Sequence, residues 1–132
     1  TLSLHDALPI FNGGPMMGRA MSNLASPVVK GCSGITVLGG AAALRGRESS
    51  CIKCAKCVSA CPMGLEPYLM AKLSRRKLWE RLEAEWVTNC IECGCCQFTC
   101  PADIPLLDFI RMGKQEVGAL IRARAAAHAT KK

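Results

Sequence analysis

Two cysteine runs constrain this chain more than any other feature of its sequence. Their eight cysteines are Cys51, Cys54, Cys57 and Cys61 in the first run, and Cys90, Cys93, Cys96 and Cys100 in the second. Both runs read C-x2-C-x2-C-x3-C, and a proline follows the last cysteine of each. This spacing is typical of bacterial [4Fe–4S] ligands, and in two-cluster proteins the fourth cysteine binds the cluster of the other run.

The prolines explain why the fourth sulfur of each run turns away from its neighbours. Pro62 and Pro101 lack an N–H group, and each biases the cysteine before it toward extended backbone. We therefore predict crossed ligation of two clusters. One ligand set is Cys51, Cys54, Cys57 and Cys100. The other set is Cys90, Cys93, Cys96 and Cys61.

Zinc and disulfides are the competing uses of these cysteines. C-x2-C pairs also bind zinc, so a zinc-binding structural module stays open as an alternative, although zinc sites rarely need a third and fourth cysteine before proline in both copies. Disulfide-bonded secreted domains spread their cysteines over loops, whereas eight of the ten here lie in two runs. We expect a reducing cytoplasm, a free thiol at Cys32 and a small buried side chain at Cys95.

Composition limits the core and the partners. The chain has 132 residues, and only six are aromatic, so we expect bound clusters to supply part of the stability. The formal charge is +7. Two cubanes of roughly −2 each would lower it to about +3. The basic residues are not interleaved with aromatics that stack on bases, so nucleic acid is not an expected partner. The longest apolar run, residues 35–44, is about half of a membrane span.

The segment before the first run divides into two parts. Residues 1–10 match the translation of a common sequencing adapter, so we exclude them from the fold prediction and expect the chain to be a C-terminal fragment of a longer protein. Residues 11–47 are rich in glycine. Short β-branched stretches at 27–30 and 35–38 predict two strands that remain from an upstream β-rich domain, either as a hairpin or as part of a sheet whose other strands are missing.

Residues 48–126 predict a mostly α-helical domain. Twenty-eight residues separate Cys61 from Cys90, whereas the compact β-type bacterial ferredoxin joins its two runs by a short hairpin-bearing segment. Apolar side chains recur here at helical spacing and predict helices over 67–75 and 77–86, with both tryptophans, Trp79 and Trp86, in the core. The expected fold is an α-helical ferredoxin with two cluster-binding halves, each followed by helix.

A long helix is expected after the second run. Asp103 is the candidate N-cap, and residues 127–132 are expected to form a frayed tail. The apolar stripe of this helix contains Leu106, Phe109, Ile110, Val117, Leu120 and Ile121. Gly113 and Gly118 are each expected to weaken it by about 1 kcal/mol relative to alanine.

The sequence also resembles a known family. The segments that carry the resemblance are GGPMMGR at 13–19, PVVKG at 27–31, the two cysteine runs, and CPMGL at 61–65. Over residues 11 to about 125, they are similar to the C subunit of the Rnf electron-transport complex. The GGPMMGR and CPMGL segments are much more specific than the cysteine spacing.

The resemblance implies a component of a membrane-associated, ion-translocating ferredoxin:NAD oxidoreductase. It implies FMN and NAD(H) sites only upstream of this fragment, so that the fragment is an electron-transfer module without a complete active site and no catalytic residue is assigned. Other subunits of the complex and soluble ferredoxin are the implied partners, at the cytoplasmic face of the bacterial inner membrane. The iron–sulfur module of a cobalamin reductase, or of another flavin-linked dehydrogenase, is the nearest competitor.

Lys53 and Lys56 lie between ligands of the first run. Two interpretations of them stay open. Their charges could raise the potential of the nearby cluster or dock an acidic electron carrier. Alternatively, they are two solvated lysines without a function.

Overall fold

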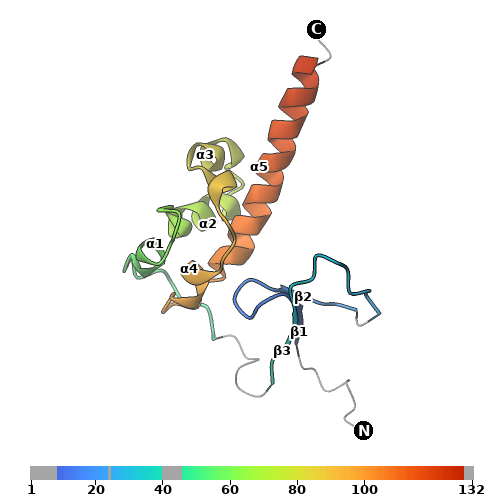
Figure 1. Ribbon diagram of the computed structural model, residues 1–132. Helices are drawn as coiled ribbons and strands as arrows, with labels where there is room; N and C mark the ends of the chain where they lie inside the picture. Colours follow the sequence, from blue (N-terminus) through green and yellow to red (C-terminus); the bar gives the residue numbers. More distant parts are fainter. Residues whose placement is uncertain (1–8, 24, 40–45, 130–132) are drawn as a thin grey trace. The chain divides into compact units, whose positions relative to one another are not determined.

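The computed structural model describes residues 9–23, 25–39 and 46–129 and divides the chain into two units between Arg47 and Glu48. The first unit contains a three-stranded antiparallel sheet (Figure 1). Strand β1 (Ile10–Asn12) lies in the centre, between β2 (Arg19–Ala20) and β3 (Ile35–Val37). The sheet is held at one edge by the Thr36 hydroxyl, which donates a hydrogen bond of 2.7 Å to the carbonyl oxygen of Gly13.

Of the two strands predicted in this unit, one is present and the other is not. Strand β3 confirms the stretch at 35–38, but residues 27–30 form no strand. The partner of β3 is instead β1, in which Ile10 pairs with Val37 and Asn12 pairs with Ile35. Pro27 has no N–H to give to a ladder, and the side chains of Val28 and Val29 are exposed, so nothing draws this segment into the sheet. Ile10 belongs to the stretch that we excluded, but a backbone ladder says nothing about its origin.

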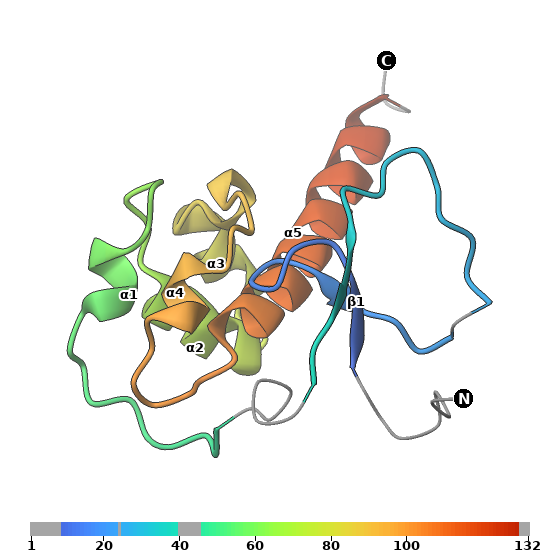
Figure 2. The ribbon, with the colours of Figure 1, turned by 60° about the horizontal axis from the view of Figure 1, so that its bottom comes forward.

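The second unit is helical. Its elements are α1 (Lys56–Ser59), α2 (Pro67–Arg75), α3 (Trp79–Ala84), η2 (Val87–Asn89), α4 (Cys95–Phe98) and α5 (Leu106–Ala129). Helices α2, α3 and α4 pack against α5, and α3 reaches its C-terminal half, where Glu83 pairs with Arg124 (Figures 1 and 2). The core is formed by Met70, Ala71, Leu73, Leu82, Val87, Cys96, Leu106, Ile110 and Val117. None of the helices in the described ranges is long and apolar enough to cross a membrane.

The region between the cysteine runs confirms one predicted helix and shortens the other. Helix α2 has the predicted bounds, with Pro67 at its first turn. Helix α3 covers only six residues, and the N–H of Glu85 already closes its last turn. Trp86 then adopts a left-handed conformation with φ 58°, and its side chain is 66% exposed. The prediction that both tryptophans are core residues is therefore wrong for Trp86, while Trp79 packs against the core.

The sequence predicted that Asp103 caps the N-terminus of α5, and this prediction is wrong. Asp103 has φ 50° and lies three residues before the helix begins at Leu106. The side-chain oxygen of Gln97, on α4, instead accepts a hydrogen bond of 3.1 Å from the backbone N–H of Leu107. The first N–H groups of a helix have no acceptor within the helix. Gln97, in the neighbouring cysteine run, supplies an acceptor for the N–H of Leu107.

Replacing Gln97 with alanine should lower the free energy of unfolding by about 0.5–1.5 kcal/mol, because the buried N–H of Leu107 loses its acceptor. Gln97→Glu is the matched control, since it keeps an oxygen acceptor at the positive end of the helix. Thermal unfolding followed by circular dichroism compares the two. An equal loss in both variants would contradict the capping role.

Helix α5 is longer than expected and crosses α2 closely. It runs to Ala129, so residues 127–129 are helical, whereas the last three residues of the predicted tail lie outside the described residues. Gly113 is buried at the crossing, where a Cβ atom would overlap the Ser74 hydroxyl and the Leu82 side chain. The expectation that Gly113 only weakens the helix is incomplete, because its missing side chain also makes room for α2.

The two halves of this unit repeat at a spacing of 39 residues, which the numbers of the cysteines already show. In the first half, left-handed or positive φ angles occur at Lys53, Ala55 and Gly64; in the second, they occur at the equivalent positions Glu92, Gly94 and Asp103. Backbone hydrogen bonds repeat as well: the Cys61 N–H donates to Val58, and the Cys100 N–H donates to Gln97. The predicted pseudo-twofold repeat is present in the backbone of the two runs.

Candidate metal centre

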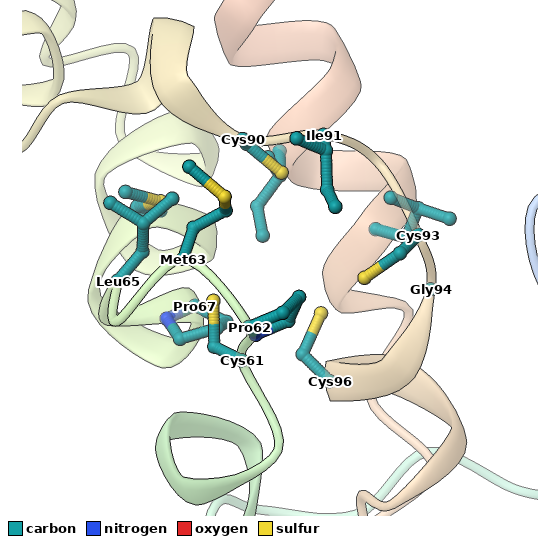
Figure 3. A pocket seen from close by; sticks show the side chains of 13 residues that line it. Cys61, Pro62, Met63, Leu65, Pro67, Cys90, Ile91, Cys93, Gly94 and Cys96 are labelled. Carbon is teal, nitrogen blue, oxygen red and sulfur yellow. The ribbon is translucent and has the colours of Figure 1, made fainter.

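One cavity gathers the cysteines of the second predicted ligand set. We call it the second-run cavity; it is lined by Cys90, Cys93 and Cys96 and by Cys61 from the first run. In Figure 3, the sulfur atoms of these four residues point toward the same space. The rest of the lining is apolar and includes Met63, Leu65, Met70, Leu107 and Ile110. None of the described residues that line it is charged.

A second cavity gathers the other predicted set. This first-run cavity is lined by Cys51, Cys54 and Cys57 and by Cys100 from the second run. It is more open to solvent than the second-run cavity, because Cys51 and Cys54 are exposed whereas Cys96 is buried. Lys53 and Lys72 are part of its lining. Each cavity thus takes three cysteines from one run and one from the other.

The cavities are close neighbours, separated by the first turns of α2 and α5. Leu69 and Leu106 line the first-run cavity, while the next residues along the chain, Met70 and Leu107, line the second-run cavity. The same two helix turns therefore form a wall of both sites. This arrangement places two groups bound in the cavities side by side.

The left-handed residues shape the loops so that backbone N–H groups can face sulfur. The N–H of Glu92, at φ 58°, lies 3.4 Å from the sulfur of Cys90 and donates to it. Successive N–H groups in such loops form concave binding sites for anions. Hydrogen bonds to ligand sulfurs stabilise the negative charge of an iron–sulfur cluster.

Burial keeps several thiols protonated in the free chain. It raises the pKa of Cys96 to about 12, with the neighbouring thiol of Cys90 adding to the shift. Burial also raises the pKa of Cys57, opposed by the backbone N–H of Tyr68, and that of Cys90, opposed by the N–H of Glu92. Thiolates are the form that binds metal, so binding at these sites must displace protons and bring in positive charge.

An ion-pair network anchors the second run to α5, and the sequence pattern did not predict it. The Glu92 carboxylate accepts from Arg111 at 2.9 Å and pairs with Lys114 at 3.2 Å. The Lys114 ammonium also donates to the carbonyl oxygen of Cys90 at 2.6 Å. Burial alone would raise the pKa of Glu92, but the two cations outweigh it and hold that pKa below its usual value. Glu92 lies far from Arg111 and Lys114 in the sequence and on no common helix, so no local spacing reveals this contact.

The two remaining cysteines stay outside the cavities. Cys95 lies beside Cys93 without lining either cavity and is half-buried, so the expectation of a small buried side chain is only partly met. The pKa of the Cys95 thiol is raised mainly by a hydrogen bond with Cys93 and, to a smaller extent, by burial. Cys32 is a free thiol in the first unit, as predicted, and donates to the carbonyl oxygen of Gly34.

The donor sets fit cubane clusters. Four soft sulfurs surround each cavity, and cysteine thiolates are the usual ligands of [4Fe–4S] clusters. Across the described ranges, no three cysteine, histidine or acidic side chains converge closely enough to hold a single metal ion. A zinc ion needs sulfurs about 2.3 Å from one centre. A cubane takes one sulfur at each of four separate irons, so its ligands stand further apart.

Comparison with known proteins agrees with this chemistry. Residues 50–105 match a family model described as a 4Fe-4S dicluster domain. The C subunit of a Na(+)-translocating ferredoxin:NAD(+) oxidoreductase complex from Acetobacterium woodii is 42% identical over 108 residues, which cover 82% of this chain. Over most of its length, the chain is similar to the C subunits of ion-translocating oxidoreductase complexes. The predicted resemblance to the Rnf complex is confirmed by these matches.

Two further relatives are also C subunits of oxidoreductase complexes. The C subunit of a proton-translocating ferredoxin:NAD(+) oxidoreductase complex in Clostridium ljungdahlii is 43% identical over 61% of this chain. The C subunit of an ion-translocating oxidoreductase complex from Methanosarcina acetivorans is 39% identical over 79% of it. The chain spans only about a fifth of the length of these relatives, between 18% and 24%.

Proposed function

We propose that this chain is the two-cluster electron-transfer module of an Rnf-type, membrane-associated oxidoreductase. The observation that carries the proposal is the crossed lining of the two cavities, in which each takes its fourth cysteine from the opposite run. The match to a 4Fe-4S dicluster domain supports it. When bound, [4Fe–4S] clusters supply one-electron acceptors and donors.

The residues of the chain perform three tasks in this proposal. Cys51, Cys54, Cys57 and Cys100 hold one cluster, and Cys90, Cys93, Cys96 and Cys61 hold the other. The apolar lining of the second-run cavity excludes water. The shared wall of α2 and α5 keeps the two sites adjacent, which is the arrangement that successive one-electron steps need.

We propose that the rest of the activity needs regions that the relatives contain beyond the part similar to this chain, which is about a fifth of their length. By similarity to the ferredoxin:NAD(+) oxidoreductase proteins, FMN and NAD(H) would bind in parts that this chain does not include, and further subunits at the cytoplasmic face of a membrane would be its partners. The chain itself is then a relay without a complete active site.

Anaerobic reconstitution of the full chain with iron and sulfide tests the proposal. We expect about eight irons per chain and, after reduction, the electron paramagnetic resonance spectrum of two interacting [4Fe–4S] clusters. Tight binding of zinc with no such spectrum would overturn the proposal in favour of a structural module.

A further inference from the structure

A groove with several basic side chains opens beside the first-run cavity. We call it the basic groove. It shares Cys51, Lys53 and Lys72 with the lining of that cavity and continues along α2 to Arg75 and Arg76. It is therefore a surface extension of one candidate cluster site. The second-run cavity has no such extension among the described residues that line it, since none of them is charged.

The charges of the basic groove do not cancel within the described part of the chain. Glu48 is the acidic residue of its lining, and it pairs with Arg75. Arg75 also lies over the ring of Phe109, 4.2 Å from its centroid. The remaining cations, Lys53, Lys72 and Arg76, are exposed and form no ion pair with any described residue. Three positive charges thus remain beside an exposed cysteine set.

Comparison of the two halves shows that this charge is not a consequence of the repeat. Position 53 corresponds to position 92, where the residue is Glu92 and its carboxylate is neutralised by Arg111 and Lys114. The cation at Lys53 is left without a counter-charge in the equivalent loop. The halves share a backbone conformation but differ in the charge they show to solvent.

We propose that the basic groove docks the acidic face of a partner redox protein, with the first-run site as the port for electrons. This inference rests on the proposed function and identifies the side of the module that meets a partner. Complementary charge steers association and fixes orientation. In each encounter, one electron passes between the redox group of the partner and the cluster held by Cys51, Cys54, Cys57 and Cys100. One side is oxidised by one electron, the other is reduced by one, and no bond or proton is transferred.

A protein partner fits this surface better than a membrane. The cations line a concave groove instead of a flat or convex face, so a bilayer surface could not reach all of them together. Electron exchange also requires that the partner carry its own redox group close to the exposed cysteines. Anionic lipid would satisfy the charges without serving as an electron donor or acceptor.

Charge reversal within the groove tests the proposal. The double variant Lys53→Glu/Lys72→Glu changes two exposed residues, and glutamate is compatible with the backbone at position 53 because Glu92 has nearly the same φ. The matched control Arg81→Glu/Arg122→Glu makes the same net charge change at exposed residues that line neither the groove nor either cavity. A small acidic [2Fe–2S] ferredoxin is the probe for both variants and for the parent chain.

Two readouts are compared on the reconstituted full chain. Isothermal titration calorimetry gives the dissociation constant of the oxidised probe, and stopped-flow absorbance gives the rate of electron transfer from the reduced probe. At low ionic strength, we expect the groove variant to have a dissociation constant at least about tenfold higher and a rate of electron transfer at least about tenfold lower than the parent chain. In the control, both quantities should change by less than about twofold. Iron content and the spectrum of the reduced chain should be equal in both double variants, which separates docking from cluster damage. Binding of the oxidised probe transfers no electron, so it separates docking from a change in the reduction potential.

Each alternative result has a definite meaning. Equal effects of the two double variants would overturn the groove as a docking site. Loss of binding to phosphatidylglycerol vesicles in the groove variant, with unchanged binding of the acidic protein, would assign the surface to a membrane instead. If the parent chain assembles no [4Fe–4S] clusters, the proposed function fails, and that result is visible in the iron content before any partner is added.

Discussion

Replacing Cys61 with alanine is expected to remove the cluster of the second run and leave that of the first. Cys61 lies beside Pro62 in the first run, but its sulfur points into the cavity of Cys90, Cys93 and Cys96 (Figure 3). Loss of one ligand from a four-cysteine set should lower the iron content from about eight to about four per chain. The reduced variant should also lose the spectral signature of two interacting clusters.

The identity of the remaining cluster distinguishes crossed from local ligation. With crossed ligation, Cys61→Ala and Cys90→Ala leave the same cluster, so their spectra and reduction potentials should agree. Cys100→Ala and Cys51→Ala should agree with each other and differ from the first pair. A Cys61→Ala spectrum that matches Cys51→Ala would contradict the crossed arrangement. Cys95→Ala is the control and should keep about eight irons, because Cys95 lines neither cavity.

The second large effect is expected at the crossing of α2 and α5. Gly113→Ala would place a methyl group against the Ser74 hydroxyl and the Leu82 side chain, and also 3.2 Å from the Ser74 Cβ atom. Ser74 and Leu82 are both fully buried, so they cannot move into solvent. Overpacking of this kind costs about 1–3 kcal/mol, against a gain of about 1 kcal/mol in helix propensity. We expect a net loss of up to about 2 kcal/mol, and the thermal unfolding midpoint should fall by about 4–8 °C for each kcal/mol lost.

Gly118→Ala is the matched control on the same helix. A Cβ atom at that position meets only the guanidinium end of Arg122, at 3.3 Å, and this flexible side chain can move away. The alanine should therefore raise the unfolding midpoint through helix propensity alone. Two variants with the same sign would show that the crossing is not tightly packed.

The elements predicted best are those set by local spacing. The apolar repeat of α2 depends on residues a few positions apart, and the structure confirms the predicted bounds of that helix. The errors come from distant contacts. The cap of α5 is Gln97 and not Asp103 because a neighbouring run reaches the helix end, and the partner of β3 is β1 because two chain segments meet in space.

The sequence pattern also did not predict which residues have a positive φ or where two helices pack closely. A positive φ at Trp86 turns a large apolar side chain into solvent, although its spacing predicts burial. Gly113 looks like a weak point of the helix until Ser74 is seen opposite it. Both cases depend on three-dimensional geometry that neighbouring letters do not encode. The network of Glu92, Arg111 and Lys114 belongs to the same class.

The exchange of one cysteine between the two 39-residue halves has a consequence for how the module can be assembled and lost. Neither half alone encloses a complete set of four sulfurs, because each cavity takes one cysteine from the other half. A polypeptide cut between α2 and Cys90 would leave each piece with three cysteines of one cavity and one of the other. If the proposed clusters are bound, cofactor insertion and chain folding should therefore be interdependent, and oxidative damage at either cluster should loosen the half that holds the other.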